Sequence, residues 1–238
     1  MSASLAEDGA DVRGMFERIA PRYDAANRVM SAGVDIIWRK QAITRLIDGL
    51  DETPRFLDLG AGTLDGALEI ARRVPGARVA AADFARAMLV AGGHKLAGGN
   101  GHAHSIDRHA ADGHHLPYRA GAFDGAFSAF CIRNLSDLPL GLRELRRVVR
   151  PGGRVVLLEF LRPDKPRWFF DRVYNAHVLP LLGWMVSGDR AAYRYLPDSI
   201  ARFRSPGELA ALLGDVGFAS VETKALFPSG VATMVVAS

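Results

Sequence analysis

The stretch "RFLDLGAGTLDGALEIARR", residues 55–73, passes from an apolar run through two glycines into residues spaced at helical intervals. "RFLDLG" is typical of a buried strand and "LDGALEIARRV" of a helix. Glycines between a strand and a helix let the backbone approach a ligand. Because ligands of open parallel sheets lie beyond the carboxyl ends of the strands, we expect a ligand at Gly60 and Gly62.

The chain after Pro54 alternates strand and helix patterns, which indicates right-handed crossovers and a mostly parallel sheet with helices on both faces. Two final strands lie close enough in sequence to pair antiparallel, and a weak strand is expected near residues 105–111. Before Pro54 the pattern is helical, interrupted at Pro21 and Gly33. The predicted strands are 55–60, 77–84, 122–130, 153–160, 219–227 and 230–238, and the predicted helices after Pro54 are 64–74, 85–96, 138–150 and 205–218.

Composition excludes several classes of protein. The net charge of +4 is small and spread along all 238 residues, so no nucleic-acid partner is expected. The single Cys131 cannot form an internal disulfide, and the N-terminus lacks the pattern of an export signal. No apolar segment reaches the roughly 18 to 20 residues that cross a bilayer. A cytoplasmic protein is expected, either free or at the inner face of the membrane.

The residues around the glycines select among nucleotide ligands. Asp65 stands where the dinucleotide fingerprint has its third glycine, and no lysine follows the glycines as in a Walker loop. Asp58 and Asp65 would repel a pyrophosphate at the helix start. Asp83, about twenty residues further on, is placed to accept ribose hydroxyls. These residues favour a cationic, phosphate-free nucleoside, and S-adenosylmethionine has this chemistry.

No metal site is predicted. Six of the seven histidines lie between His94 and His115, but glycines separate them and no fixed Cys or carboxylate pattern accompanies them.

Several stretches resemble one family in order and over nearly the whole chain. "DLGAGT" with a downstream acid looks like the nucleoside motif of class I methyltransferases. The more specific segments resemble the ubiquinone/menaquinone biosynthesis C-methyltransferase family, and they are "MFERIAPRYDAANRVMSAGVDIIWR", "ADGHHLPYRAGAFD", "FCIRNLSD", "LRELRRVVRPGGRVVLLEF" and "YLPDSIARFRSPGELAALLGDVGF".

The resemblance implies a Rossmann-like class I methyltransferase sheet with an antiparallel last strand and an N-terminal helical lid. We expect residues 1–50 to form the lid and residues 51–238 the S-adenosylmethionine-binding domain. Within that domain, residues 161–204 are expected to form a helical substrate lid, the whole being one structural unit.

The resemblance also implies site residues. Cofactor-binding residues are expected at Asp58, Gly60, Gly62, Thr63, Asp83, Asp112, Gly113 and Asn27. Arg133 and Asn134 are expected to line a quinol pocket, with Tyr23 closing over the site.

The implied reaction is methylation of a ring carbon of a polyprenyl quinol, in menaquinone or ubiquinone biosynthesis. A deprotonated ring hydroxyl makes the adjacent carbon nucleophilic, so we expect Arg133 to stabilise the phenolate and Asn134 to orient the hydroxyl. The base stays open among Asp112 through a water, His115, Tyr23 and bulk solvent. Arg133 as a salt-bridge arginine and Asp65 as a helix cap are the structural alternatives.

Several positions depart from the family pattern: Leu64 replaces glycine, Ala26 methionine, Asp35 histidine and Ala129 serine, and "LEFLRP" stands where the family has "LEFSKP". They leave open a paralogue acting on another small aromatic or lipid substrate, or a non-catalytic scaffold. A nicotinamide-dependent oxidoreductase is a third alternative, opposed by the missing glycine.

Aromatic and cationic residues gather in "RPDKPRWFFDRVYNAHVLPLLGWMVSG", including Trp168, Phe169, Phe170 and Trp184. This pattern suits either contact with a membrane surface or a buried lid helix. A homodimer and a quinone-synthesis complex are further expected partnerships.

Overall fold

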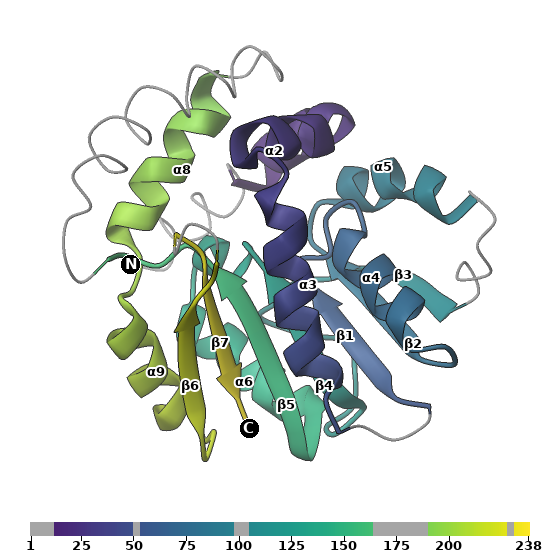
Figure 1. The fold of residues 1–238 in the computed structure, drawn as a ribbon, viewed down its shortest axis with the longest axis vertical. Helices are drawn as coiled ribbons and strands as arrows, with labels where there is room; N and C mark the ends of the chain where they lie inside the picture. Colours follow the sequence, from purple (N-terminus) through teal and green to yellow (C-terminus); the bar gives the residue numbers. More distant parts are fainter. Residues whose placement is uncertain (1–11, 50–52, 98–104, 164–189, 228–230) are drawn as a thin grey trace.

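The computed structural model describes residues 12–49, 53–97, 105–163, 190–227 and 231–238, with the side chains of 190–194 left aside. One seven-stranded sheet has the order β3-β2-β1-β4-β5-β7-β6. The first five strands are parallel, and β7 runs antiparallel to both β5 and β6 (Figure 1). Their bounds are β1 Arg55–Leu59, β2 Arg78–Asp83, β3 Ile106–Ala110, β4 Phe123–Ala129, β5 Val149–Glu159, β6 Val221–Ala225 and β7 Thr233–Ala237.

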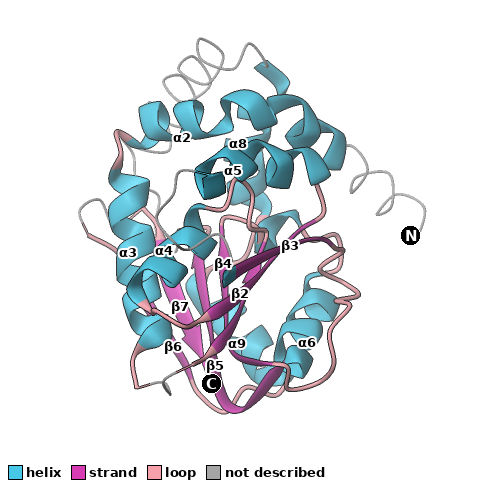
Figure 2. Ribbon diagram, turned by 90° about the vertical axis from the view of Figure 1, so that its right-hand side faces the viewer, coloured by secondary structure: helices cyan, strands magenta, loops and turns pink. Residues whose placement is uncertain are grey.

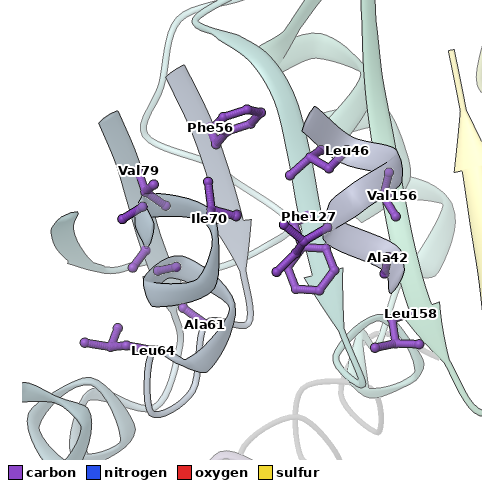
Figure 3. Packing of buried hydrophobic residues seen from close by; sticks show 14 of the residues in the cluster. Ala42, Leu46, Phe56, Ala61, Leu64, Ile70, Val79, Phe127, Val156 and Leu158 are labelled. Carbon is purple, nitrogen blue, oxygen red and sulfur yellow. The ribbon is translucent and has the colours of Figure 1, made fainter. Parts of the chain in front are cut away.

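Helices cover both faces of the sheet (Figure 2). One face packs against α3 (Val34–Ile47), α4 (Asp65–Arg73) and α5 (Arg86–Ala97), and the other against α6 (Leu138–Val148) and α9 (Pro206–Asp215). Figure 3 shows Ala42 and Leu46 of α3 lying against Phe127 and Val156 of the sheet. The two apolar clusters lie on opposite faces because the central strands are apolar on both sides, as parallel strands usually are.

The N-terminal segment lies across the carboxyl ends of the parallel strands. Residues 12–19 are helical, and a 3-10 turn (η1, Ala20–Arg22) containing Pro21 leads into α2, Tyr23–Ser31. Gly33, with φ +77°, separates α2 from α3. Figure 1 places α2 and α8 (Arg190–Arg202) above the sheet at this end. Phe16 and Tyr23 pack against Phe84 and Met88, which joins this segment to the start of α5.

The predicted fold class is confirmed, including the weak strand near residue 105 and the antiparallel final pair. Most of the expected substrate lid, with Trp168, Phe169, Phe170 and Trp184, lies outside the described residues. The division into lid and catalytic domain stays a prediction. Within the described part of the chain, no helix is both long and apolar enough to cross a membrane.

Candidate active site

The glycine loop joins the end of β1 to α4 and is tied to the neighbouring strand. The backbone N–H groups of Gly60 and Ala61 both donate to the Ala82 carbonyl oxygen, at 2.8 and 3.0 Å. Gly60 and Gly62 have φ of +69° and +53°, a region that glycine enters without strain. A side chain at Gly60 would also overlap Cys131. This loop therefore needs glycine at position 60 for two separate reasons.

Asp58 is the last residue but one of β1 and lies beside Gly66 at the start of α4, where it is 2% exposed. It accepts a hydrogen bond from the backbone of Ala67. Gly66 permits this packing, because a Cβ there would lie 2.7 Å from Asp58 Oδ2. Burial raises the pKa of Asp58 to about 7, against the lowering effect of Arg39. Asp58 thus supports the loop from below.

Asp83 ends β2 and holds the glycine loop from the side. Its Oδ2 accepts the Gly62 N–H at 2.8 Å, and its Oδ1 accepts the Ala85 N–H at 2.8 Å. Burial raises the pKa of Asp83 to about 6, although these two hydrogen bonds lower it. Each carboxylate oxygen has a second lone pair, so the group can still accept a ligand hydroxyl.

Thr63 connects the loop to the N-terminal helices. Its hydroxyl donates to Asp24 of α2, and Lys95 of α5 lies within hydrogen-bond distance of both Thr63 Oγ1, at 3.2 Å, and Asp24 Oδ2, at 2.6 Å. Three elements far apart in the sequence thereby meet at the loop's last polar side chain.

Asp65, the first residue of α4, is surrounded by cations. Lys95 Nζ lies 2.6 Å from it, Arg28 Nη2 2.7 Å and Arg39 Nη1 3.7 Å. Burial raises the pKa of Asp65, but Arg39, Lys95 and Arg28 lower it overall. The expectation that Asp58 and Asp65 repel phosphate is thus not supported, since one carboxylate is buried below the loop and the other is neutralised.

Asp35, which stands at the family's histidine position, extends this ion-pair cluster. It pairs with Arg28 and with Arg39, at 3.3 Å, and accepts the Ser31 hydroxyl at 2.7 Å. We call Asp24, Arg28, Asp35, Arg39, Asp65 and Lys95 the lid network. This network joins α2 and α3 to the first residue of α4 and to the last turn of α5.

Leu64, at the family's glycine position, has φ +73° and precedes α4. Its side chain is completely buried in the same cluster as Ile70. Apolar burial here offsets the roughly 1–2 kcal/mol cost of a left-handed backbone for a residue with a Cβ.

Tyr23 lies over the glycine loop, as expected of a residue that closes the site. A Cβ at Gly62 would be 4.0 Å from the Tyr23 ring. Asn27, one helical turn later, hydrogen-bonds the Tyr23 side chain. Burial raises the pKa of Tyr23, and Arg39, Arg133 and Asp83 are its charged neighbours.

Arg133 and Asn134 lie in a 3-10 turn, η3 (Ile132–Asn134), directly after β4. The Arg133 guanidinium pairs through Nη1 with Glu159 at the end of β5, and its Nε donates to Ser199 Oγ at 3.0 Å. Asn134 Oδ1 accepts the Tyr195 hydroxyl at 2.9 Å. Arg133 is therefore a salt-bridge arginine as well as a candidate site residue.

Asp112 and Gly113 lie in the loop after β3. The Asp112 carboxylate is 59% exposed and is held by the His114 backbone N–H at 2.9 Å and the His114 ring at 2.6 Å. Partial burial raises the pKa of Asp112, and the bonds to His114 lower it overall. Gly113 is buried, where a Cβ would lie 3.0 Å from Leu135. Among the described residues, no hydrogen bond or ion pair joins Asp112 to the glycine loop, and its carboxylate bonds His114 instead.

Cys131 links the glycine loop to the Arg133 segment. It contacts Gly60, and Asp83, Glu159 and Arg133 all influence its thiol. Burial raises the pKa of Cys131, which keeps the thiol neutral. The ends of β1, β2, β4 and β5 thus bring Gly60, Asp83, Arg133 and Glu159 to one region.

Sequence reasoning missed Glu159, Tyr195, Ser199 and the partners of Asp65. Glu159 carried a usable signal, because it is a charged residue closing an apolar strand, as Asp83 is. Tyr195 and Ser199 carried none, since nothing local shows that α8 lies against η3. In the part of the chain that the structure describes, no three His, Cys, Asp or Glu residues are grouped as metal ligands; His102 and His104 lie outside it.

Comparison with known proteins identifies the chain's relatives. The model of the ubiE/COQ5 methyltransferase family matches residues 4–238. A demethylmenaquinone methyltransferase of Thermus thermophilus is 44% identical, over 86% of this chain and 91% of its own length. A ubiquinone/menaquinone biosynthesis C-methyltransferase of Geobacter sulfurreducens is 42% identical, over 90% and 83%.

Solved structures share the fold at low sequence identity. A SAM-dependent methyltransferase from Thermotoga maritima has a TM-score of 0.63 at 17% identity, with 94% of this chain and 98% of that chain covered. A Haemonchus contortus phosphoethanolamine N-methyltransferase in complex with S-adenosylhomocysteine has a TM-score of 0.61 at 14% identity, covering 83% and 51%. With the family model spanning almost all of the sequence, the chain belongs to the ubiE/COQ5 methyltransferase family.

Proposed function

We propose that this methyltransferase transfers a methyl group from S-adenosylmethionine to a ring carbon of a polyprenyl quinol in menaquinone or ubiquinone biosynthesis. The observation that carries the proposal is the contact of Gly60 with Cys131. It places the loop expected to bind the cofactor beside the turn expected to bind the quinol. A methyl donor and a ring bound at these two places would lie next to each other, as in-line transfer requires.

The loop residues fit the donor. S-Adenosylmethionine supplies an electrophilic methyl group on a sulfonium when bound. Gly60 and Gly62 leave space for its close approach to the backbone, and the buried Asp83 carboxylate is suited to accept ribose hydroxyls. Asp58, Thr63, Asn27, Asp112 and Gly113 are proposed to support or complete this site. Asp58 acts through the loop, because it is buried beneath α4.

The turn after β4 fits an aromatic ring that must ionise. Arg133 offers a permanent positive charge for the phenolate, and Asn134 can orient a ring hydroxyl. Tyr23 lies near both Arg133 and Asp83, and its raised pKa keeps it protonated, so we assign it hydrogen-bond donation rather than proton removal.

Aromatic side chains beside this turn provide an apolar surface. The ring centroids of Phe130 and Phe160 are 4.6 Å apart, and the Trp38 ring is 5.9 Å from that of Phe160. Phe130 and Phe160 flank the ends of β4 and β5, next to Arg133 and Glu159. Stacked and edge-on rings of this kind suit contact with a quinol ring.

The substrate ring could be a naphthoquinol or a benzoquinol. We propose demethylmenaquinol, a naphthoquinol, as the first choice, because the Thermus thermophilus relative is named for it. A ubiquinol precursor is the second choice of substrate, because the Geobacter sulfurreducens relative is named for both ubiquinone and menaquinone biosynthesis. Liquid chromatography and mass spectrometry of quinones from a deletion strain should show a species short by one methyl group. An unchanged quinone profile would contradict the proposal.

We further propose that the chain works at the inner, cytoplasmic face of the membrane, where a polyprenyl substrate resides, as a homodimer or in a quinone-synthesis complex. The aromatic residues and the surplus of Arg and Lys in the sequence of residues 162–188 support membrane contact. Replacing Phe169 and Phe170 by Ser should reduce co-sedimentation with liposomes; unchanged sedimentation would contradict membrane contact.

Light scattering of the purified chain tests the proposed self-association.

A further inference from the structure

A completely buried carboxylate stands behind the proposed phenolate-binding arginine. Glu159 ends β5 with 0% of its side chain exposed, and the Arg133 side chain is 6% exposed. Glu159 Oε1 accepts from Arg133 Nη1 and from the Phe160 N–H at 2.9 Å, and Oε2 accepts the Arg133 backbone N–H at 3.4 Å. The carboxylate thus holds both the backbone and the guanidinium of one residue.

This arrangement limits how Arg133 can turn. An isolated charge so deeply buried would be costly, and the pair is acceptable because each ion compensates the other. With Nη1 on Glu159 and Nε on Ser199, the plane of the guanidinium is fixed from two sides. Among the described residues, Nη2 has no hydrogen-bond partner, so it is the nitrogen left for a substrate oxygen.

Helix α8 supplies the other hydrogen-bond partners of Arg133 and Asn134. Ser199 accepts from Arg133 Nε and donates to the Leu196 carbonyl oxygen at 2.8 Å. Tyr195, four residues earlier and therefore on the same face of the helix, donates to Asn134 Oδ1. Two consecutive residues of η3 are thus each bonded to one residue of α8.

We propose that Glu159, Ser199 and Tyr195 form a clasp that positions Arg133 and Asn134 for the quinol, with Glu159 as the positioning residue for the guanidinium. The inference rests on the proposed function, because it assigns the clasp a role in that reaction. Because α8 supplies Ser199 to Arg133 and Tyr195 to Asn134, packing of α8 against η3 also aligns these two side chains. The site is organised when α8 is seated against η3.

The clasp has an electrostatic consequence that a purely structural role lacks. The Arg133–Glu159 pair is neutral as a unit, so the phenolate is stabilised by less than a lone arginine would supply. Arg133 influences two titratable groups, Tyr23 and Cys131, and Glu159 also influences Cys131. Asp83 acts on both of these groups, and Arg39 acts on Tyr23. Glu159→Gln removes a negative charge, which stabilises the phenolate and lowers the apparent pKa of the bound hydroxyl.

The test uses the full-length protein with S-adenosylmethionine and a short-chain demethylmenaquinol. For Glu159→Gln we expect kcat on the pH plateau to fall at least tenfold, because the guanidinium loses its alignment. KM for S-adenosylmethionine should stay within twofold. The acid limb of the kcat profile should move to lower pH. Glu159→Asp keeps the charge but shortens the side chain, so its acid limb should match wild type while kcat stays reduced.

Glu144→Gln is the matched control, because Glu144 forms a two-bond pair with Arg147 at 2.6 and 2.7 Å on α6. It should leave both kcat and the pH profile unchanged. Tyr195→Phe removes only the hydroxyl that donates to Asn134 and should lower kcat severalfold. This variant replaces Glu159→Gln in the test if Glu159→Gln does not fold. An inactive wild type would contradict the proposed function. An active wild type with unaltered kcat in Glu159→Gln or Tyr195→Phe, or an unmoved acid limb in Glu159→Gln, would overturn the clasp.

Discussion

Asp58 shows how one buried carboxyl group makes stability depend on pH. Its pKa of about 7 in the folded protein lies above the value of 3.8 for an unperturbed aspartate. As pH rises between these values, the unfolded chain releases the proton while the folded protein retains it. Folding therefore loses stability through this window, by up to about 1.4 kcal/mol per pH unit, and the loss is complete above pH 7.

Asp58→Asn removes this penalty, since an amide does not ionise. We expect the free energy of unfolding of the variant, relative to wild type, to rise between pH 4 and pH 7, as measured by urea denaturation. Asp124→Asn is the control of opposite sign. Partial burial raises the pKa of Asp124, but the Arg55 N–H and Arg150 lower it overall. That variant should lose relative stability as pH rises toward about 4, and its difference from wild type should be constant above that pH. If the free energies of unfolding of wild type and Asp58→Asn change with pH in parallel between pH 4 and pH 7, the raised pKa of Asp58 is contradicted.

Gly92 of α5 tests the close packing of the glycine loop. A Cβ at this position would lie 2.6 Å from the Thr63 carbonyl oxygen and 2.8 Å from Leu64 Cγ. Gly92→Ala must therefore displace backbone next to the proposed cofactor site. We expect at least a tenfold rise in the Kd for S-adenosylmethionine, measured by calorimetry.

The neighbouring Gly93→Ala separates this effect from helix propensity. Its Cβ would meet the guanidinium of Arg108, with Nη1 at 2.7 Å and Cζ at 3.6 Å, which is the end of a flexible side chain. Both variants gain the same helix propensity from alanine. Equal cofactor affinities for the two variants would rule out a packing effect on the loop.

At the scale of elements, the lid network attaches α2 and α3 to the glycine loop. Arg28 bridges Asp35 on α3 and Asp65 on α4 with its side chain 34% exposed, so solvent weakens its contribution. We expect Arg28→Ala to increase the release rate of S-adenosylmethionine about threefold in stopped-flow displacement. The difference from wild type should shrink as salt is added, because salt screens exposed charges.

Arg45→Ala is the matched control, since Arg45 is a similarly exposed arginine near the end of α3 that pairs with Glu222 of the edge strand β6 at 3.0 Å and not with the glycine loop. Its release rate should equal that of wild type. A salt-independent effect of Arg28→Ala would show that packing, and not charge, attaches the N-terminal helices.

The order and type of elements could be predicted because local patterns specify them. The breaks at Pro21 and Gly33 are both present. The helix predicted over residues 205–218 is α9, and Ser205 caps its start in a capping box with Glu208. The partners of Asp65 could not be predicted, since they come from α2, α3 and α5. Pairing between distant elements has no local signal in one sequence.

For the whole molecule, sheet topology is what assembles the candidate site. The order β2-β1-β4-β5 places four strand ends side by side, and each strand ends in or is followed by a candidate site residue: Asp83, Gly60, Arg133 and Glu159. The sequence predicted three of these residues as site members and omitted Glu159. The repulsion of phosphate by Asp65 that the sequence suggested is absent, because ion pairs with Arg28 and Lys95 neutralise that carboxylate.

The central claim is that this chain moves a methyl group from S-adenosylmethionine to a quinol ring carbon. The most direct measurement is mass spectrometry of the product after the purified protein is incubated with demethylmenaquinol and S-adenosylmethionine bearing a trideuterated methyl group. We expect the intact label on a ring carbon, stable to conditions that cleave methyl ethers. Absence of labelled product, or label on oxygen, would contradict the account.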